Sequence, residues 1–111
     1  MPDAGAYEAL RAADHATFAA HVGETFRMRL DGGISTELQL IEVTPGGARA
    51  TELAQAEHRR APFSLLFREP TGRRLPQRIY VLEHERLGEL GLFLVPLGPD
   101  RQGMRYEAVF T

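Results

Sequence analysis

The hydrophobic pattern of the chain changes from a helical to a strand-like period after its first fifth. Near the start, apolar side chains recur at close to helical spacing, as at Tyr7, Leu10 and Phe18, and alanine is abundant. The pattern therefore predicts a helical N-terminal segment over 1–22, followed by an antiparallel β domain over 24–111. Together they form one domain.

Beyond this segment, apolar and polar residues alternate in short runs, which is typical of half-exposed strands. Phe26 and Met28 share one face, for example, and Arg27 and Arg29 lie on the other. Turn sequences containing glycine or proline separate the runs. A mainly β fold of about six antiparallel strands in sequential order, closed as a small barrel or compact sandwich, is expected. The expected strands are 25–30, 35–43, 62–69, 77–85, 88–96 and 103–111.

Two stretches depart from this simple alternation. The run at 35–43 changes phase between Leu40 and Ile41, which predicts a β-bulge or a strand end covered on both faces. Residues 48–61 are rich in Ala, Glu and Arg without a clear period. A helical turn, a polar strand and a loop all remain open there.

The strands expected at 77–85 and 88–96 are apolar on both faces, whereas a single antiparallel sheet normally keeps one face in water. Either the N-terminal helix covers the second face with Tyr7, Leu10 and Phe18, or this face contacts another chain. The chain also ends within a strand, which is free to pair with a neighbour if it lies at an edge. The residues expected to form the interaction surface are Ile79, Val81, Phe93, Val95 and Phe110.

Size and composition bound the class of protein. A chain of 111 residues and 12.4 kDa is the usual size of one domain. It has no Cys for disulfides or thiolate metal sites, no apolar run long enough to span a membrane and no signal-peptide pattern at its start. We therefore expect a cytoplasmic protein or a component of an assembled particle.

The charge pattern argues against nucleic acid or an anionic membrane as a partner, because the formal net charge is −2 and no basic stretch stands out. All 13 cationic residues are Arg, and both Lys and Asn are missing. The explanation we favour is the codon usage of a GC-rich genome, because Lys and Asn codons are AT-rich. The functional alternative is selection of Arg for forked, bidentate contacts.

The run Glu83-His84-Glu85 is the most chemically suggestive stretch, since imidazole and carboxylate together can bind a divalent metal, with His58 or His21 as further ligands. Adjacent side chains of a strand point to opposite faces, however, so His84 is separated from its two neighbours. The interpretation we favour has His84 and Gly88 organising the hairpin turn, with His84 bonded to backbone groups and no metal or cofactor bound.

No catalytic arrangement is evident. Ser35 and Ser64 are the only serines, and neither lies in a nucleophile-elbow motif. We therefore expect a protein that is not an enzyme. A small-ligand-binding barrel is an alternative, but the residues expected inside look sufficient to fill it: Phe26, Met28, Phe63, Phe67, Tyr80, Leu92 and Phe110. A metal-dependent enzyme using His84 is the weaker alternative.

Four blocks of the chain, FAAHVGETFRM, FSLLFREP, QRIYVLEHERLGELGLFLVPLG and YEAVF, resemble a family of small uncharacterised bacterial domains. The resemblance spans residues 18–110, and Arg78 departs from it where a small residue, often Gly, is expected. It implies an accessory or assembly role beside phage-tail-collar or tail-fibre-like proteins. The residues that match its hallmark positions are His84, Leu87, Gly88, Pro96, Tyr106 and Phe110.

These observations lead to one functional hypothesis. We expect a non-enzymatic protein-interaction module, binding either a protein partner or a second copy of itself, within a bacterial or phage-tail-like system. A small molecule is not the expected partner.

Overall fold

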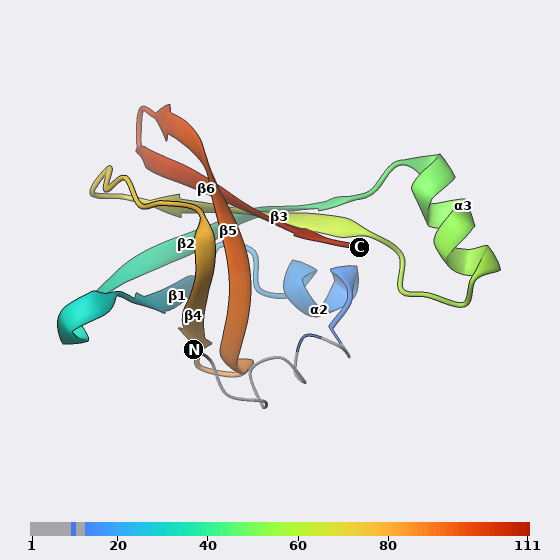
Figure 1. Cartoon of the computed structure of the whole chain (residues 1–111), viewed down its shortest axis with the longest axis horizontal. Coiled ribbons are helices and arrows are strands. Elements are labelled where there is room, and N and C mark those ends of the chain that lie inside the picture. Colours follow the sequence, from blue (N-terminus) through green and yellow to red (C-terminus); the bar gives the residue numbers. More distant parts are fainter. Residues whose placement is uncertain (1–9, 11–12) are drawn as a thin grey trace.

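The computed structural model describes residue 10 and residues 13–111, and its main feature is a closed barrel of six antiparallel strands (Figure 1). The predicted fold class is confirmed. A short helix, α2, precedes the barrel, and a second helix, α3, lies in the connection between β2 and β3. The elements are α2 (His15–Ala19), β1 (Thr25–Arg29), η1 (Asp31–Gly33), β2 (Ser35–Pro45), α3 (Ala48–Ala56), β3 (Phe63–Glu69), β4 (Arg78–His84), β5 (Gly88–Asp100) and β6 (Gly103–Phe110).

The strands do not follow one another around the barrel. Their order is β1-β2-β3-β6-β5-β4, so β3 and β4 are consecutive in sequence but not neighbours in space. The expected sequential meander is therefore wrong at this one connection. β6 lies between β3 and β5, pairing with both. The strand that ends at Phe110 is consequently not an edge strand, so the condition for pairing with a neighbour there is not met.

Alternation along the strands builds the interior. In β3 and β6 every second side chain is buried, as the period-two pattern predicts. The phase change in β2 is a β-bulge, since its register with β3 shifts between Leu40 and Glu42. The side chains expected to fill the barrel are all buried, namely Phe26, Met28, Phe63, Phe67, Tyr80, Leu92 and Phe110.

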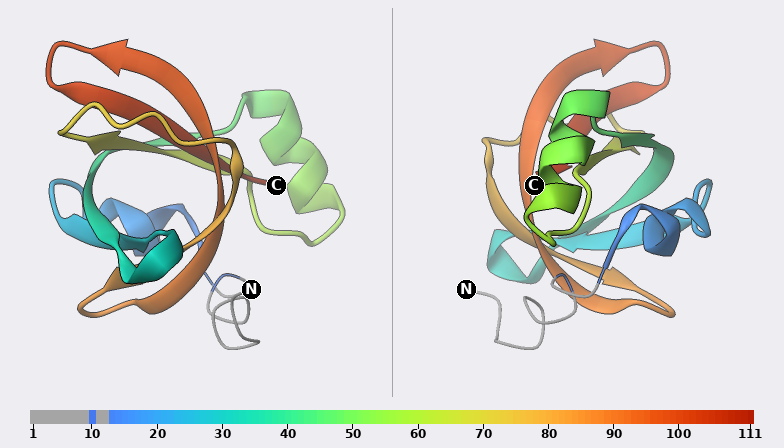
Figure 2. Two further views of the ribbon diagram at one scale, coloured as in Figure 1. Left: turned by 60° about the vertical axis from the view of Figure 1, so that its left-hand side comes forward. Right: turned by 90° about the vertical axis from the view of Figure 1, so that its right-hand side faces the viewer.

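Helix α2 closes one end of the barrel rather than covering its outer face (Figures 1 and 2). The Asp14 carboxylate caps it by accepting a hydrogen bond from the Thr17 N–H at 2.9 Å. Phe18 is fully buried and packs against the rings of Phe63 and Phe110, with centroids 5.9 and 5.5 Å apart. One aromatic side chain thereby joins the helix to the core.

Helix α3 projects from the barrel between β2 and β3 (Figure 2). The sequence left a helical turn, a polar strand and a loop open for residues 48–61. The structure has a helix there, and the alanines of 48–56 favour one. His58 ends it by adopting a left-handed conformation with φ 55°. The Arg59 N–H donates to the Ala54 carbonyl at 2.7 Å across this end.

The barrel wall is closed unevenly. β4 pairs with β5 along its whole length, from Arg78 to His84. Between β1 and β4, by contrast, the register contains only Arg27 with Glu83 and Met28 with Leu82. The first half of β4, residues 78–81, therefore has no strand partner on its β1 side in the described part of the chain.

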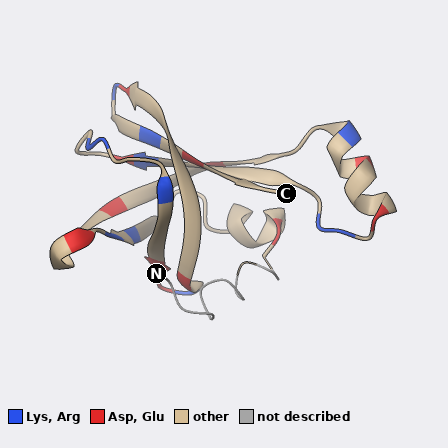
Figure 3. Cartoon of the chain, viewed as in Figure 1, with Lys and Arg blue, Asp and Glu red and all other residues tan. Residues whose placement is uncertain are grey.

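Charged residues of both signs are spread over the strands, hairpins and α3 (Figure 3). This distribution matches the sequence, in which no basic stretch stands out. Among residues 10 and 13–111, no helix is long and apolar enough to cross a membrane.

Candidate functional site

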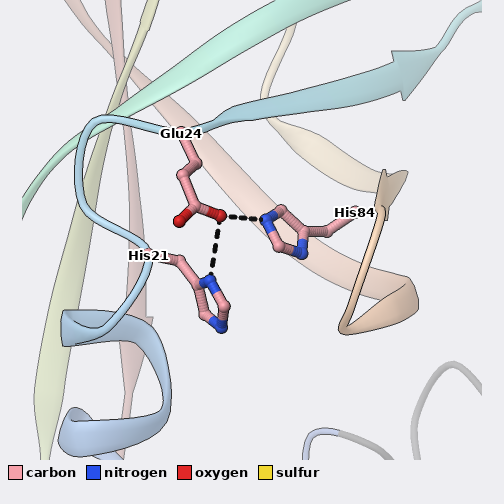
Figure 4. A group of neighbouring side chains, drawn as sticks. All are labelled: His21, Glu24 and His84. Carbon is pink, nitrogen blue, oxygen red and sulfur yellow. Dashed lines mark hydrogen bonds and ion pairs between the residues drawn. The ribbon is translucent and has the colours of Figure 1, made fainter.

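Two features of the barrel are candidates for function: a cluster of His21, Glu24 and His84, and an apolar stripe on the outer wall. The cluster joins segments far apart in sequence (Figure 4). His21 and Glu24 lie in the turn between α2 and β1, and His84 is the last residue of β4. Their ligand-type atoms lie within 4.8 Å of one another.

Both imidazoles bond to one carboxylate oxygen. The His84 Nε2 and the His21 Nδ1 lie 2.8 and 2.9 Å from Glu24 Oε1. These hydrogen bonds, first that from His21 and then that from His84, hold the pKa of Glu24 below its ordinary value. Glu24 is therefore ionised at neutral pH, so both ring nitrogens facing it donate.

The other nitrogen of His84 fixes the tautomer. Nδ1 accepts hydrogen bonds from the N–H groups of Arg86 and Leu87, at 3.1 and 3.2 Å, in the β4–β5 hairpin. With two donors pointing at it, Nδ1 carries the lone pair and Nε2 carries the proton. The interpretation of His84 as the turn-organising residue agrees with this geometry.

The same tautomer opposes metal binding at this cluster. A neutral imidazole that binds a metal through Nε2 carries its proton on Nδ1. In His84 that proton would meet the N–H groups of Arg86 and Leu87, so both turn hydrogen bonds would have to break. The cluster therefore fits a structural link between the α2–β1 turn and the hairpin better than a zinc site.

Among the described residues, the other suggested metal ligands do not join this cluster. Glu83 bonds to Arg29 across the β1–β4 contact, with its Oε1 2.6 Å from the Arg29 Nε. Glu85 is exposed in the hairpin loop. His58 lies at the end of α3, which projects away from the barrel (Figure 1). Gly88 has φ 77° and pairs with His84 at the hairpin, which explains why this position suits glycine.

The second candidate is an apolar stripe that crosses three neighbouring strands on the outside of the barrel. It consists of Ile79 on β4, Phe93 on β5 and Val109 on β6, whose exposed fractions are 44, 51 and 64%. Ile79 and Phe93 face each other across the β4–β5 ladder. Phe93 and Val109 line the same shallow groove where β5 and β6 separate. Val81 and Val95 flank the stripe and are half-buried.

Phe110 does not belong to this surface. It is buried, and its ring stacks on Phe63 with centroids 4.5 Å apart and planes 8° apart. Its placement on the outer face was wrong because β6 alternates, which turns Val109 outward and Phe110 inward. Val109 was missed, although the same alternation in MRYEAVF could have identified it.

Two described residues of the N-terminal segment bear on whether it covers this stripe. Phe18 is fully buried and packs against Phe63 and Phe110 at the end of the barrel. Leu10 lines the groove beside Phe93 and Val109. Tyr7, which was also expected to cover the face, lies outside the described residues.

Comparison with known proteins places the chain in a family. Residues 13–110 match the model of a domain of unknown function, DUF6916. The chain belongs to this family. No curated protein and no solved structure matches the chain.

The DUF6916 match covers the whole barrel, α2 and α3. Both the His21–Glu24–His84 cluster and the apolar stripe therefore lie within the family domain. The resemblance seen in the sequence blocks agrees with this assignment to an uncharacterised small domain.

Proposed function

We propose that this DUF6916 domain is a protein-interaction module whose binding surface is the stripe of Ile79, Phe93 and Val109. The observation that carries the proposal is the continuity of the stripe across three strands on a chain of mixed surface charge. Contiguous apolar side chains are costly to leave in water, and such surfaces typically mark contact sites. The family resemblance suggests an assembly or accessory role in a bacterial or phage-tail-like system.

The two alternative functions have weaker support. A small-ligand barrel needs internal space, but the interior positions named above hold buried, packed side chains. A metal-dependent enzyme needs His84 as a ligand, and its tautomer opposes that role. An interaction surface, by contrast, requires neither an empty barrel interior nor a different tautomer of His84.

The test compares the wild-type chain with Phe93→Ser and with Leu53→Ser as a matched control. Leu53 lies on α3 and is 52% exposed, against 51% for Phe93, so both substitutions remove a similar exposed apolar side chain. Light scattering measures self-association, and affinity purification from the native host measures partner binding. The proposal predicts that Phe93→Ser reduces self-association or retention of the partner while Leu53→Ser does not. A monomeric chain whose co-purifying proteins are the same for all three forms would overturn it.

A further inference from the structure

The first half of β4 offers a second kind of contact, because its backbone edge is open. Pairing with β1 is confined to Leu82 and Glu83, whereas pairing with β5 extends back to Arg78. Along 78–81 the backbone groups on the β1 side therefore have no strand neighbour among the described residues. An exposed strand edge is a template for another strand.

A groove lies beside this edge. Its volume is about 420 Å³, and it is bounded by residues 78–81 on one side and by Arg29, Leu30 and Asp31 on the other. The second wall exists because the chain turns away after β1, where the Leu30 N–H donates to the Ile34 carbonyl at 2.7 Å. A segment that pairs with the backbone of residues 78–81 would lie about 4.8 Å from β4, on the side where this groove opens. The occupant that suits the groove is therefore a single extended segment.

The charges of the groove indicate what such a segment carries. Arg29 is already bonded to Glu83 and Glu89. Arg78 has a weaker partner, since its Nη2 lies 3.4 Å from an oxygen of Asp31, whose side chain is 90% exposed. Its guanidinium stacks over the Tyr80 ring, 4.9 Å from the centroid, which holds it at the groove. Arg78 is therefore positioned to bind an acidic residue.

We propose that residues 78–81 bind an extended segment of a partner protein, which adds a strand to β4. This segment carries an apolar residue that packs beside Ile79 and an acidic residue that pairs with Arg78. The inference rests on the proposed function, because it specifies which kind of partner segment contacts the stripe at Ile79. A second copy fits less well, since each barrel would have to insert β4 past the wall formed by Arg29, Leu30 and Asp31 of the other.

The probe is a library of random linear peptides displayed on phage and selected against the folded chain. We expect the selected peptides to alternate β-branched or aromatic residues with polar ones and to contain Asp or Glu. A bound peptide should slow amide hydrogen exchange at 78–81. Arg78→Glu should weaken a selected acidic peptide by about tenfold or more, because a charge-assisted hydrogen bond is replaced by repulsion. Repeating the selection on Arg78→Glu should enrich basic residues instead.

Arg74→Glu is the matched control, because Arg74 is also exposed but lies outside the groove. It should leave peptide affinity unchanged. Circular dichroism confirms that each variant is folded. The inference is overturned if no peptide is enriched, if selected peptides protect no amide at 78–81, or if those amides are protected by dimerisation of the chain alone. Peptides that respond to Phe93→Ser but not to Arg78→Glu would overturn this inference and leave the proposed function intact.

Discussion

Ile79 on β4 lies directly opposite Phe93 on β5, on the outer wall of the barrel, and both side chains remain about half exposed. Val109 continues the same surface on β6. Side chains that point outward from a barrel do not contribute to its core. We propose that the apolar character of these three side chains reflects a contact with another protein.

Replacing His84 tests its structural role. His84→Ala removes the acceptor for the Arg86 and Leu87 N–H groups and the donor to Glu24, so we expect a loss of about 2–3 kcal/mol in the free energy of unfolding. His84→Asn keeps an acceptor near Nδ1 and should cost less. Urea denaturation gives both values. An exposed control in the same hairpin, Glu85→Ala, should change stability by less than about 0.5 kcal/mol. Equal effects at His84 and Glu85 would contradict the account.

The tautomer of His84 gives a separate prediction about metals. Long-range ¹H–¹⁵N spectra at neutral pH should show the Nε2–H form, because Nδ1 accepts two backbone hydrogen bonds. Calorimetric titration with Zn²⁺ should accordingly give no tight stoichiometric binding. A 1:1 zinc complex that disappears in His84→Ala would show that the cluster is a metal site instead.

Glu24 predicts a pH dependence of stability. Its folded-state pKa is lowered, chiefly by the hydrogen bonds from His21 and His84. A carboxylate with a lowered pKa stabilises the fold above its unfolded pKa, about 4.3 for Glu. That contribution is lost as pH falls through the lower folded value. Asp14 and Asp100 also have lowered pKa values, through hydrogen bonds with Thr17 and Arg68, and act in the same direction.

The test of this dependence is Glu24→Gln, which removes the charge but keeps an acceptor oxygen. Unfolding free energies measured between pH 3 and 6 should fall less steeply toward acid for Glu24→Gln than for the wild-type chain. Parallel curves would show that Glu24 is not linked to folding in this way.

Gly103 predicts a backbone constraint in the β5–β6 hairpin. It has φ 149°, and a Cβ there would lie 2.2 Å from the Glu69 carbonyl oxygen. Gly103→Ala should therefore destabilise the chain by about 2 kcal/mol or more, since neither backbone can move cheaply. Gly72 has φ 78° with nothing within 4 Å of the added Cβ, so Gly72→Ala should cost only about 1 kcal/mol. Thermal unfolding of both variants measures the difference, and equal losses would contradict the steric explanation.

The sequence predicts the local features of this barrel well because alternation and turn residues act over a few positions. The β2 bulge and the hairpin between His84 and Gly88 both follow from such local patterns. The strand order does not, because the pairing of β3 with β6 joins segments about 40 residues apart without a local signal. Helix α3 was left open because Ala, Glu and Arg suit both a helix and a solvated loop.

The candidate sites show the same limit. Strand geometry alone separates His84 from Glu83, and in the structure Glu83 bonds to Arg29. The sequence could not identify Glu24 as the partner of His84, because that contact depends on how β1 and β4 meet. Among the described residues, the lack of a β1-side partner for 78–81 likewise depends on where β1 and β4 meet. The β4 sequence does not reveal it, because its pattern is the same as that of a strand paired on both sides.

The most direct test of the central claim is site-specific photo-crosslinking in the native host. A benzoylphenylalanine placed at position 93 reports what lies against the stripe, and the same group at position 53 on α3 is the control, because both positions are about equally exposed. We predict a discrete protein adduct, to a partner or a second copy, from position 93 and none of the same mass from position 53. The absence of an adduct at 93, or identical adducts at both positions, would contradict the assignment of this surface as a protein-binding site.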